Sequence, residues 1–208
     1  MPVLPQFPLG SVLLPGMVLP LHVFEPRYRE MIEQVLAGDR RFGVVLIERG
    51  PEVGGGDVRT MVGTSAEIVD ADRLGDGRLH LLVLGRERFK VVEWLADDPY
   101  PKAEIELWPD TSAVGSDPGL AEAVTVKFRR CMVLASEGGM DVGPVLKMLA
   151  ESGRSASGLS SMQMAAAVPV STMDKQALLG CPGELERLTM LDRLIVEAEE
   201  LIKLHLQG

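Results

Sequence analysis

Aromatic residues are distributed unevenly along this chain of 208 residues. Eight of the nine lie within residues 1–108, and Phe128 alone follows. Beyond residue 119 the chain is rich in Ala, Met and Leu. The segment PDTSAVGSDPG at 109–119 separates the two regions and has the Pro, Gly, Ser and Asp content of a linker. The composition therefore predicts two domains, residues 1–112 and residues 117–208, in a chain long enough to bury a sizeable core.

The first region has the short apolar runs and frequent turn signals of a β-rich domain. Pro15-Gly16 and the GDG sequence at 75–77 are typical of turns between strands. Pro20 favours an edge strand or a bulge, because proline donates no ladder hydrogen bond. The runs that resemble strands lie at 11–14, 17–21, 42–49, 61–74, 78–85, 86–95 and 102–108. They predict a small closed or half-closed antiparallel sheet of at least six strands.

Residues 79–84 are apolar on both faces apart from His80, which predicts a strand in the middle of this sheet.

A single helix is expected to interrupt the strands. Pro26 suits the first helical position, and Glu25 before it lies at the favourable end of the helix dipole. Gly38 is a typical end signal. The apolar positions between them follow helical spacing: Tyr28, Met31, Ile32, Val35 and Leu36.

The second region is predicted to be helical. One helix extends from Asp117-Pro118 to Gly138-Gly139, a short one ends at Pro169, and Ser171 with Asp174 forms a capping box for a third. The last helix begins near residue 184 and has an apolar seam of Leu188, Leu191, Ile195, Ala198 and Ile202. The fold class is therefore α+β, a β-rich domain followed by a helical bundle. In an alternative interpretation the seam is shared between two chains of a homodimer.

Charge and composition exclude several functions. The formal net charge of -9 and a pI near 4.9 argue against a nucleic-acid partner. No apolar stretch is long enough to span a membrane, and the N-terminus lacks the basic start of a signal peptide. Cys131 and Cys181 are expected to be free, buried thiols in a reducing cytoplasm. We therefore expect a cytoplasmic protein.

Motifs for bound groups are missing from the sequence. The glycine-rich stretch GPEVGGGDVRT at 50–60 lacks the lysine of a phosphate-binding loop and resembles a hairpin tip. His22, His80 and His205 have no partner three or four residues away, so we expect no metal site. His22 is interpreted as a strand residue. No cofactor is expected.

Catalytic signals are equally weak. Ser160 or Ser161 could pair with Lys175 as a Ser–Lys dyad, because spacing alone does not rule this out. The alternative is that one of the two serines caps the helix that follows it. Cys131 in the middle of a predicted helix is interpreted as a core residue.

Residues 24–28, FEPRY, are the strongest candidates for a binding surface. They place two aromatic rings and two charges where a strand meets a helix, and aromatic residues and Arg are the usual anchors of binding patches. Phe24, Glu25, Pro26, Arg27 and Tyr28 are therefore candidate protein-binding residues. In the alternative interpretation, Phe24 and Tyr28 both pack into the core.

Motifs in the first region resemble a known family. They are Phe7-Pro8-Leu9, Pro15-Gly16-Met17, Pro20-Leu21, residues 24–28, Gly63-Thr64 and Gly85-Arg86-Glu87-Arg88. In this order they resemble the N-terminal substrate-binding domain of the Lon proteases over residues 1 to about 110. The segment KQALLGCPGELERLTML at 175–191 is similar to the helical extension of that family.

The resemblance implies a pseudo-barrel of the pseudouridine-synthase-and-archaeosine-transglycosylase type (PUA-like), followed by a helical bundle. It implies recognition of unfolded or exposed apolar polypeptide segments, with a separate protease or chaperone as a further partner. The chain lacks the Walker lysine of the ATPase module, so we expect a non-catalytic protein with peptidase S16 kinship. The alternatives are a residual peptidase or hydrolase and, by fold analogy alone, an RNA-binding protein.

Overall fold

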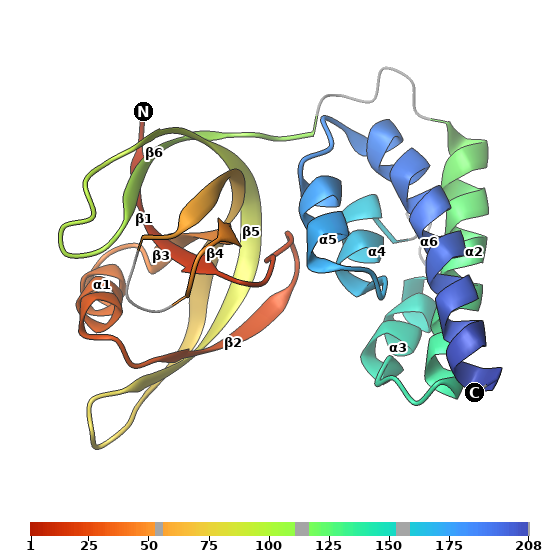
Figure 1. Ribbon diagram of the computed structural model, residues 1–208, viewed down its shortest axis with the longest axis horizontal. Coiled ribbons are helices and arrows are strands. Elements are labelled where there is room, and N and C mark those ends of the chain that lie inside the picture. Colours follow the sequence, from red (N-terminus) through yellow and green to blue (C-terminus); the bar gives the residue numbers. More distant parts are fainter. Residues whose placement is uncertain (53–55, 111–116, 153–158, 208) are drawn as a thin grey trace. The chain divides into compact units, whose positions relative to one another are not determined.

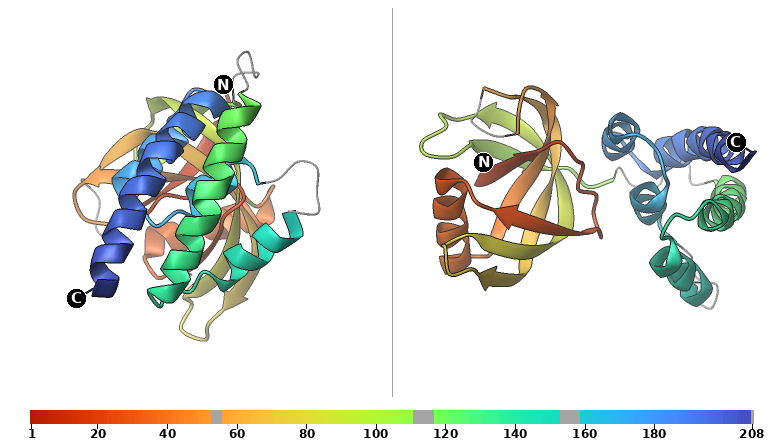
Figure 2. Two further views of the ribbon diagram at one scale, coloured as in Figure 1. Left: turned by 90° about the vertical axis from the view of Figure 1, so that its right-hand side faces the viewer. Right: turned by 60° about the horizontal axis from the view of Figure 1, so that its bottom comes forward.

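The computed structural model describes residues 1–52, 56–110, 117–152 and 159–207. The chain divides into two compact units, Met1–Pro109 and Asp110–Gly208. Figures 1 and 2 show the strands with one helix in the first unit and helices in the second. The α+β class is therefore as predicted. Residues 53–55 of the predicted glycine-rich tip and residues 111–116 of the predicted linker lie outside the described residues.

Six strands of the described residues form one mixed sheet in the first unit. They are β1 (Val3–Leu9), β2 (Val18–Val23), β3 (Arg41–Arg49), β4 (Val58–Arg73), β5 (Leu79–Trp94) and β6 (Lys102–Leu107). The strand order is β2-β5-β4-β3-β1-β6, and β5 also pairs with β6, so β1, β3, β4, β5 and β6 form a closed ring. All pairs are antiparallel except β1 with β3, which is parallel. The prediction of a purely antiparallel sheet is therefore wrong at this one pair.

Strand β5 belongs to two parts of the sheet. Its first half pairs with β2 and its second half pairs with β6. The sequence predicted two strands here, which is wrong because Gly85 continues the strand. The predicted hairpin turn before it is confirmed, with Leu74 N–H donating to the Arg78 carbonyl at 2.9 Å. The prediction for the faces of β5 is correct only in part, since Leu82 is exposed.

The start of the chain differs from the prediction. The first strand is β1, which contains Pro5 and Pro8, whereas residues 11–14 form no strand although Val12, Leu13 and Leu14 are buried. Strand β1 forms because it pairs with neighbouring β3, and local propensity did not indicate this pairing. The turn at Pro15-Gly16 is confirmed, with Gly16 at a φ of 84°, and Pro20 lies on edge strand β2 as predicted.

Helix α1 (Pro26–Ala37) begins and ends as predicted, with Glu25 as N-cap and Gly38 as C-cap. Its buried side chains are Tyr28, Met31, Ile32 and Val35, which join the core formed by the inward side chains of the sheet. The helix therefore holds its first turn firmly against the ends of β1 and β2.

The helices of the second unit are α2 (Pro118–Glu137), α3 (Gly143–Ser152), α4 (Ser161–Ala167), α5 (Thr172–Leu179) and α6 (Glu184–Gln207). The predicted N-caps are confirmed, because Asp117, Ser160 and Ser171 each accept backbone N–H groups at a helix start. The predicted capping box of Ser171 and Asp174 is formed only in part, since Ser171 Oγ accepts from the Asp174 N–H but donates to the Asp174 carboxylate. Helix α3 was not predicted.

Helices α2 and α6 pack against each other, and Figure 2 shows them side by side. The predicted seam on α6 is buried within the chain. In the part of the chain that the structure describes, no helix is long and apolar enough to cross a bilayer.

Candidate functional site

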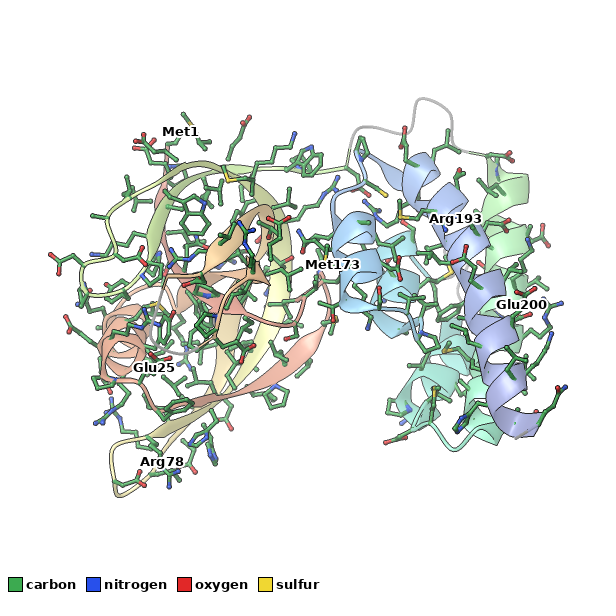
Figure 3. All side chains as sticks on the ribbon, viewed as in Figure 1. Met1, Glu25, Arg78, Met173, Arg193 and Glu200 are labelled. Carbon is green, nitrogen blue, oxygen red and sulfur yellow. The ribbon has the colours of Figure 1, made fainter. Side chains whose placement is uncertain are left out.

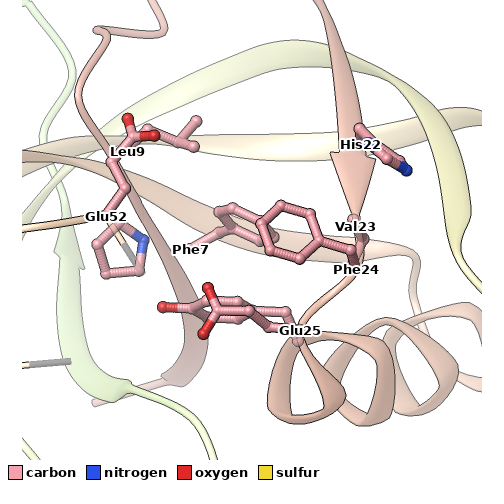
Figure 4. A pocket seen from close by; sticks show the side chains of 9 residues that line it. Phe7, Leu9, His22, Val23, Phe24, Glu25 and Glu52 are labelled. Carbon is pink, nitrogen blue, oxygen red and sulfur yellow. The ribbon is translucent and has the colours of Figure 1, made fainter. Parts of the chain in front are cut away.

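A pocket lies where the ends of β1 and β2 meet the first turn of α1 (Figure 4). These three segments provide most of its wall, and the β3–β4 connection adds a carboxylate. The lining residues are Phe7, Pro8, Leu9, His22, Val23, Phe24, Glu25, Tyr28 and Glu52. Among the described strands β2 pairs only with β5, so this wall of the pocket is an edge strand.

The inner part of the pocket is aromatic. The rings of Phe7 and Tyr28 stack with centroids 4.4 Å apart, and Phe42 lies 6.1 Å from Phe7. All three side chains are buried. Stacked, buried rings form a rigid apolar surface against which a side chain could pack.

Phe24 differs from this aromatic core, because 49% of it is exposed. Side chains alternate along a strand, and Val23 points into the core, so the next residue points outward. Its ring lies beside that of His22, with ring centroids 5.8 Å apart. The two sequence interpretations of Phe24 and Tyr28 are thus both correct in part: Tyr28 is buried and Phe24 faces solvent.

The charges at the start of α1 interact with each other. Arg27 Nε donates to Glu25 Oε2 at 3.1 Å, and the Arg27 guanidinium lies 4.5 Å from the centroid of the Tyr28 ring. Glu25 makes no side-chain capping bond to the helix. Figure 3 labels Glu25 at the base of α1. This pair orders the helix start beside the pocket.

Of the five candidate residues, the structure places Phe24, Glu25 and Tyr28 in the pocket wall, whereas Pro26 and Arg27 are not among the lining residues. Sequence reasoning missed the contributions of β1, of His22 and of Glu52. The sequence marked Phe7-Pro8-Leu9 as a family motif. The fold places this motif beside residues 22–25, which the sequence did not indicate.

Burial favours the neutral form of the Tyr28 phenol and raises its pKa from 10.0 to about 12, with Arg27 opposing the shift and Glu25 adding to it. The unfolded chain loses this proton near pH 10, whereas the folded chain retains it, so the stabilisation is complete below pH 10 and disappears as the pH rises through 12. We expect the free energy of unfolding to fall by on the order of 2 kcal/mol across this interval.

Urea unfolding as a function of pH, compared with Tyr28→Phe, measures this effect. The variant lacks the Tyr28 phenol but keeps Tyr100, whose pKa burial also raises. A parallel loss of stability in both proteins would contradict the assignment.

The residues considered for a catalytic dyad have other partners. Ser160 caps α4. The Ser161 hydroxyl accepts from Arg187 Nη1 at 2.9 Å, and Lys175 Nζ donates to the Ala166 carbonyl at 3.0 Å. Burial lowers the pKa of Lys175. The capping interpretation of Ser160 is therefore confirmed, and the Ser–Lys pair is not formed.

The thiols are also unsuited to nucleophilic chemistry. Cys131 and Cys181 are buried thiols that form no disulfide, as predicted. Burial raises the pKa of Cys131 to about 11, so its thiol stays protonated at neutral pH.

The histidines are arranged differently from what the sequence indicated. His22 is a strand residue, as predicted, but its ring lies 4.8 Å from that of His80, 58 positions later in the chain. His205 lies on α6 in the other unit. Across the described ranges, no group of three or more His, Cys, Asp or Glu side chains is placed to hold a metal ion.

An aromatic pocket beside an edge strand is a common setting for a binding site. The family profile described as the ATP-dependent protease La (LON) substrate-binding domain matches residues 3–197. The chain therefore belongs to this family.

Individual relatives agree with this assignment. The chain is 32% identical over 205 residues to a Lon protease of Anaeromyxobacter dehalogenans and to Lon protease 2 of Myxococcus xanthus, covering 97% of this chain and 24% of each relative. The chain thus spans about a quarter of the length of these curated relatives.

Solved structures show the same fold. A Lon N-terminal domain protein from Xanthomonas campestris matches with a TM-score of 0.67 and 26% identity, over 92% of this chain and 97% of that one. The N-terminal domain of a Mycobacterium avium complex Lon protease matches with a TM-score of 0.65 and 18% identity, over 94% and 98% of the two chains.

Proposed function

We propose that this chain is a non-catalytic module that binds unfolded or exposed apolar segments of other polypeptides in the pocket between β1, β2 and α1. The observation that carries the proposal is Phe24, a large aromatic side chain exposed at the rim of a pocket whose inner surface is the stacked pair of Phe7 and Tyr28. Exposed aromatic residues beside a concave apolar surface are typical of binding sites. The family to which the chain belongs is named for substrate binding.

The pocket suits an extended peptide better than a compact ligand. Its wall includes edge strand β2, whose backbone groups on the side away from β5 have no strand partner in the described sheet. An extended segment could place one apolar side chain over Phe7 and hydrogen-bond to this edge, as in other complexes in which a peptide extends a sheet. Arg27 already compensates the charge of Glu25, so the Glu52 carboxylate at the wall is the charge that favours a peptide with a basic residue beside its apolar one.

We further propose that the first unit is a PUA-like domain of residues 1–112 and that residues 117–208 form a helical-bundle domain. By binding unfolded or exposed apolar segments, the chain supplies them to a separate protease or chaperone in protein quality control. Its kinship to peptidase S16 then describes ancestry rather than activity.

Phe24→Ser tests the proposal. We expect the affinity for a reduced, carboxymethylated and fluorescently labelled polypeptide, measured by anisotropy, to fall by about tenfold or more, because the variant loses the aromatic anchor. Met61→Ser is the matched control, since Met61 is also 49% exposed but lies on β4 and is not among the pocket-lining residues.

Equal affinity of Phe24→Ser and the unchanged chain would overturn the assignment of the pocket. Equal losses in both variants would indicate unspecific apolar adhesion instead. Digestion of casein by the unchanged chain would contradict the non-catalytic role.

A further inference from the structure

Two of the three histidines of the chain face each other across neighbouring strands. His22 on β2 lies directly opposite His80 on β5 in the register of the ladder, and both side chains are exposed. The Gly85 N–H donates to the Met17 carbonyl at 2.8 Å, and hydrogen-bonded pairs alternate along an antiparallel ladder. Counting from that pair, His22 and His80 form a non-hydrogen-bonded pair, the kind in which side chains lie closest.

The two rings are already adjacent. Their centroids are 4.8 Å apart with an interplanar angle of 78°. A divalent cation bound by two imidazoles at about 2.1 Å needs ring nitrogens about 3 Å apart. Exposed side chains can reach this separation by small rotations about their χ angles, because no core packing restrains them.

Asp72 on β4 lies directly opposite His80 on the other side of β5. Its carboxylate is exposed and stands in the same cross-strand row as the two histidines. A negative charge at this position favours a cation beside His80 through simple Coulomb attraction. The row is therefore imidazole, imidazole and carboxylate, with His22 on β2 and with His80 and Asp72 on the two strands of the β4–β5 hairpin.

We propose that His22 and His80 form a two-histidine site for a late first-row divalent cation, such as Ni²⁺, Cu²⁺ or Zn²⁺. Imidazole is a preferred ligand of these ions, and water would complete the coordination sphere. The site would join edge strand β2 to β5 next to the pocket, because the His22 ring also contacts Phe24.

Calorimetric titration of the untagged chain with Ni²⁺ tests the site. We expect one ion to bind, and His22→Ala and His80→Ala each to weaken binding by about 100-fold, because each removes the second ligand of a chelate. His205→Ala is the matched control and should leave the affinity unchanged, since His205 lies on α6 in the other unit. Affinities of His22→Ala and His80→Ala within threefold of the unchanged chain would overturn the proposal, as would a loss confined to His205→Ala.

A second measurement is independent of affinity. Substoichiometric Cu²⁺ should broaden the imidazole NMR resonances of His22 and His80 together before that of His205. Broadening of His205 first, or of only one member of the pair, would exclude a shared site. Far-UV circular dichroism verifies that the variants fold, which their exposed positions favour.

The site does not depend on the proposed peptide binding. His80 is not among the pocket-lining residues, so His80→Ala should lose Ni²⁺ affinity and retain the labelled polypeptide. Phe24→Ser should show the reverse. If either Ni²⁺ binding or polypeptide binding is not observed, the other can therefore still be tested with the same variants.

Discussion

Replacing Arg187 with Ala should lower the free energy of unfolding by about 3 kcal/mol, because it leaves a void and several buried polar groups without their donor. Arg187 is fully buried on α6. Its guanidinium donates to both carboxylate oxygens of Asp110 at 2.6 and 2.8 Å, to the Ser161 hydroxyl at 2.9 Å and to the Leu178 carbonyl at 3.3 Å. One side chain thus joins α6 to α4, to the end of α5 and to Asp110, the first residue of the second unit.

The expected loss of unfolding free energy lies at the low end of the range for breaking a buried ion pair. The reason is that 36% of the Asp110 side chain is exposed, so water can solvate its carboxylate in the variant. Urea unfolding followed by far-UV circular dichroism measures the change in the helical unit.

Arg193→Ala is the control for the same helix. Arg193 is paired with Glu197 at 2.8 Å, but 61% of its side chain is exposed, and Figure 3 labels it on α6. Such an exposed pair contributes less than about 0.5 kcal/mol. If both variants lost the same stability, the network around Arg187 would not be the cause.

Gly85→Ala should destabilise the first unit by about 2 kcal/mol or more, because the new methyl group has no space. A Cβ at this position would lie 2.4 Å from the backbone oxygen of Leu14 and 3.2 Å from Leu13 Cγ. The backbone of Gly85 also binds this segment, with Gly16 N–H donating to its carbonyl at 2.8 Å. The methyl group would therefore push β5 away from the buried segment between β1 and β2.

Gly75→Ala is the matched control, since a Cβ there would meet nothing within 4 Å. It lies in the turn of the same hairpin and should change stability by less than about 0.5 kcal/mol. Fluorescence of Trp94 and Trp108 during urea unfolding reports on this unit, because both tryptophans lie within Met1–Pro109. A Gly85→Ala protein as stable as the control would show that the sheet relaxes without cost.

The boundaries of most elements were predictable from the sequence, because short-range interactions determine them. Pro26 and Gly38 mark the ends of α1, and Asp117, Ser160 and Ser171 cap three helices with bonds to residues two or three positions away. The apolar run 79–84 correctly indicated a strand inside the sheet, but only the face of Leu79, Leu81 and Val83 is buried.

The errors in the predicted sheet arise where pairing overrides local propensity. Strand β1 contains two prolines, yet it forms because β3 on one side and β6 on the other offer ladders to it. The parallel register of β1 with β3 has no local sequence signal. The uninterrupted course of β5 through Gly85 depends on its pairing with β4 from Leu79 to Lys90, on both sides of this glycine.

That the segment FEPRY joins a strand to a helix and carries two aromatic rings follows from the order of the residues alone, because period-two and period-3.6 patterns are local. That Tyr28 stacks on Phe7 inside while Phe24 faces solvent depends on long-range packing. The same holds for His22 opposite His80 and for Arg187 on Asp110, pairs separated by 58 and 77 positions. Such contacts depend on which surfaces are buried together when the chain folds. The packing of the whole core determines this, and no single segment does.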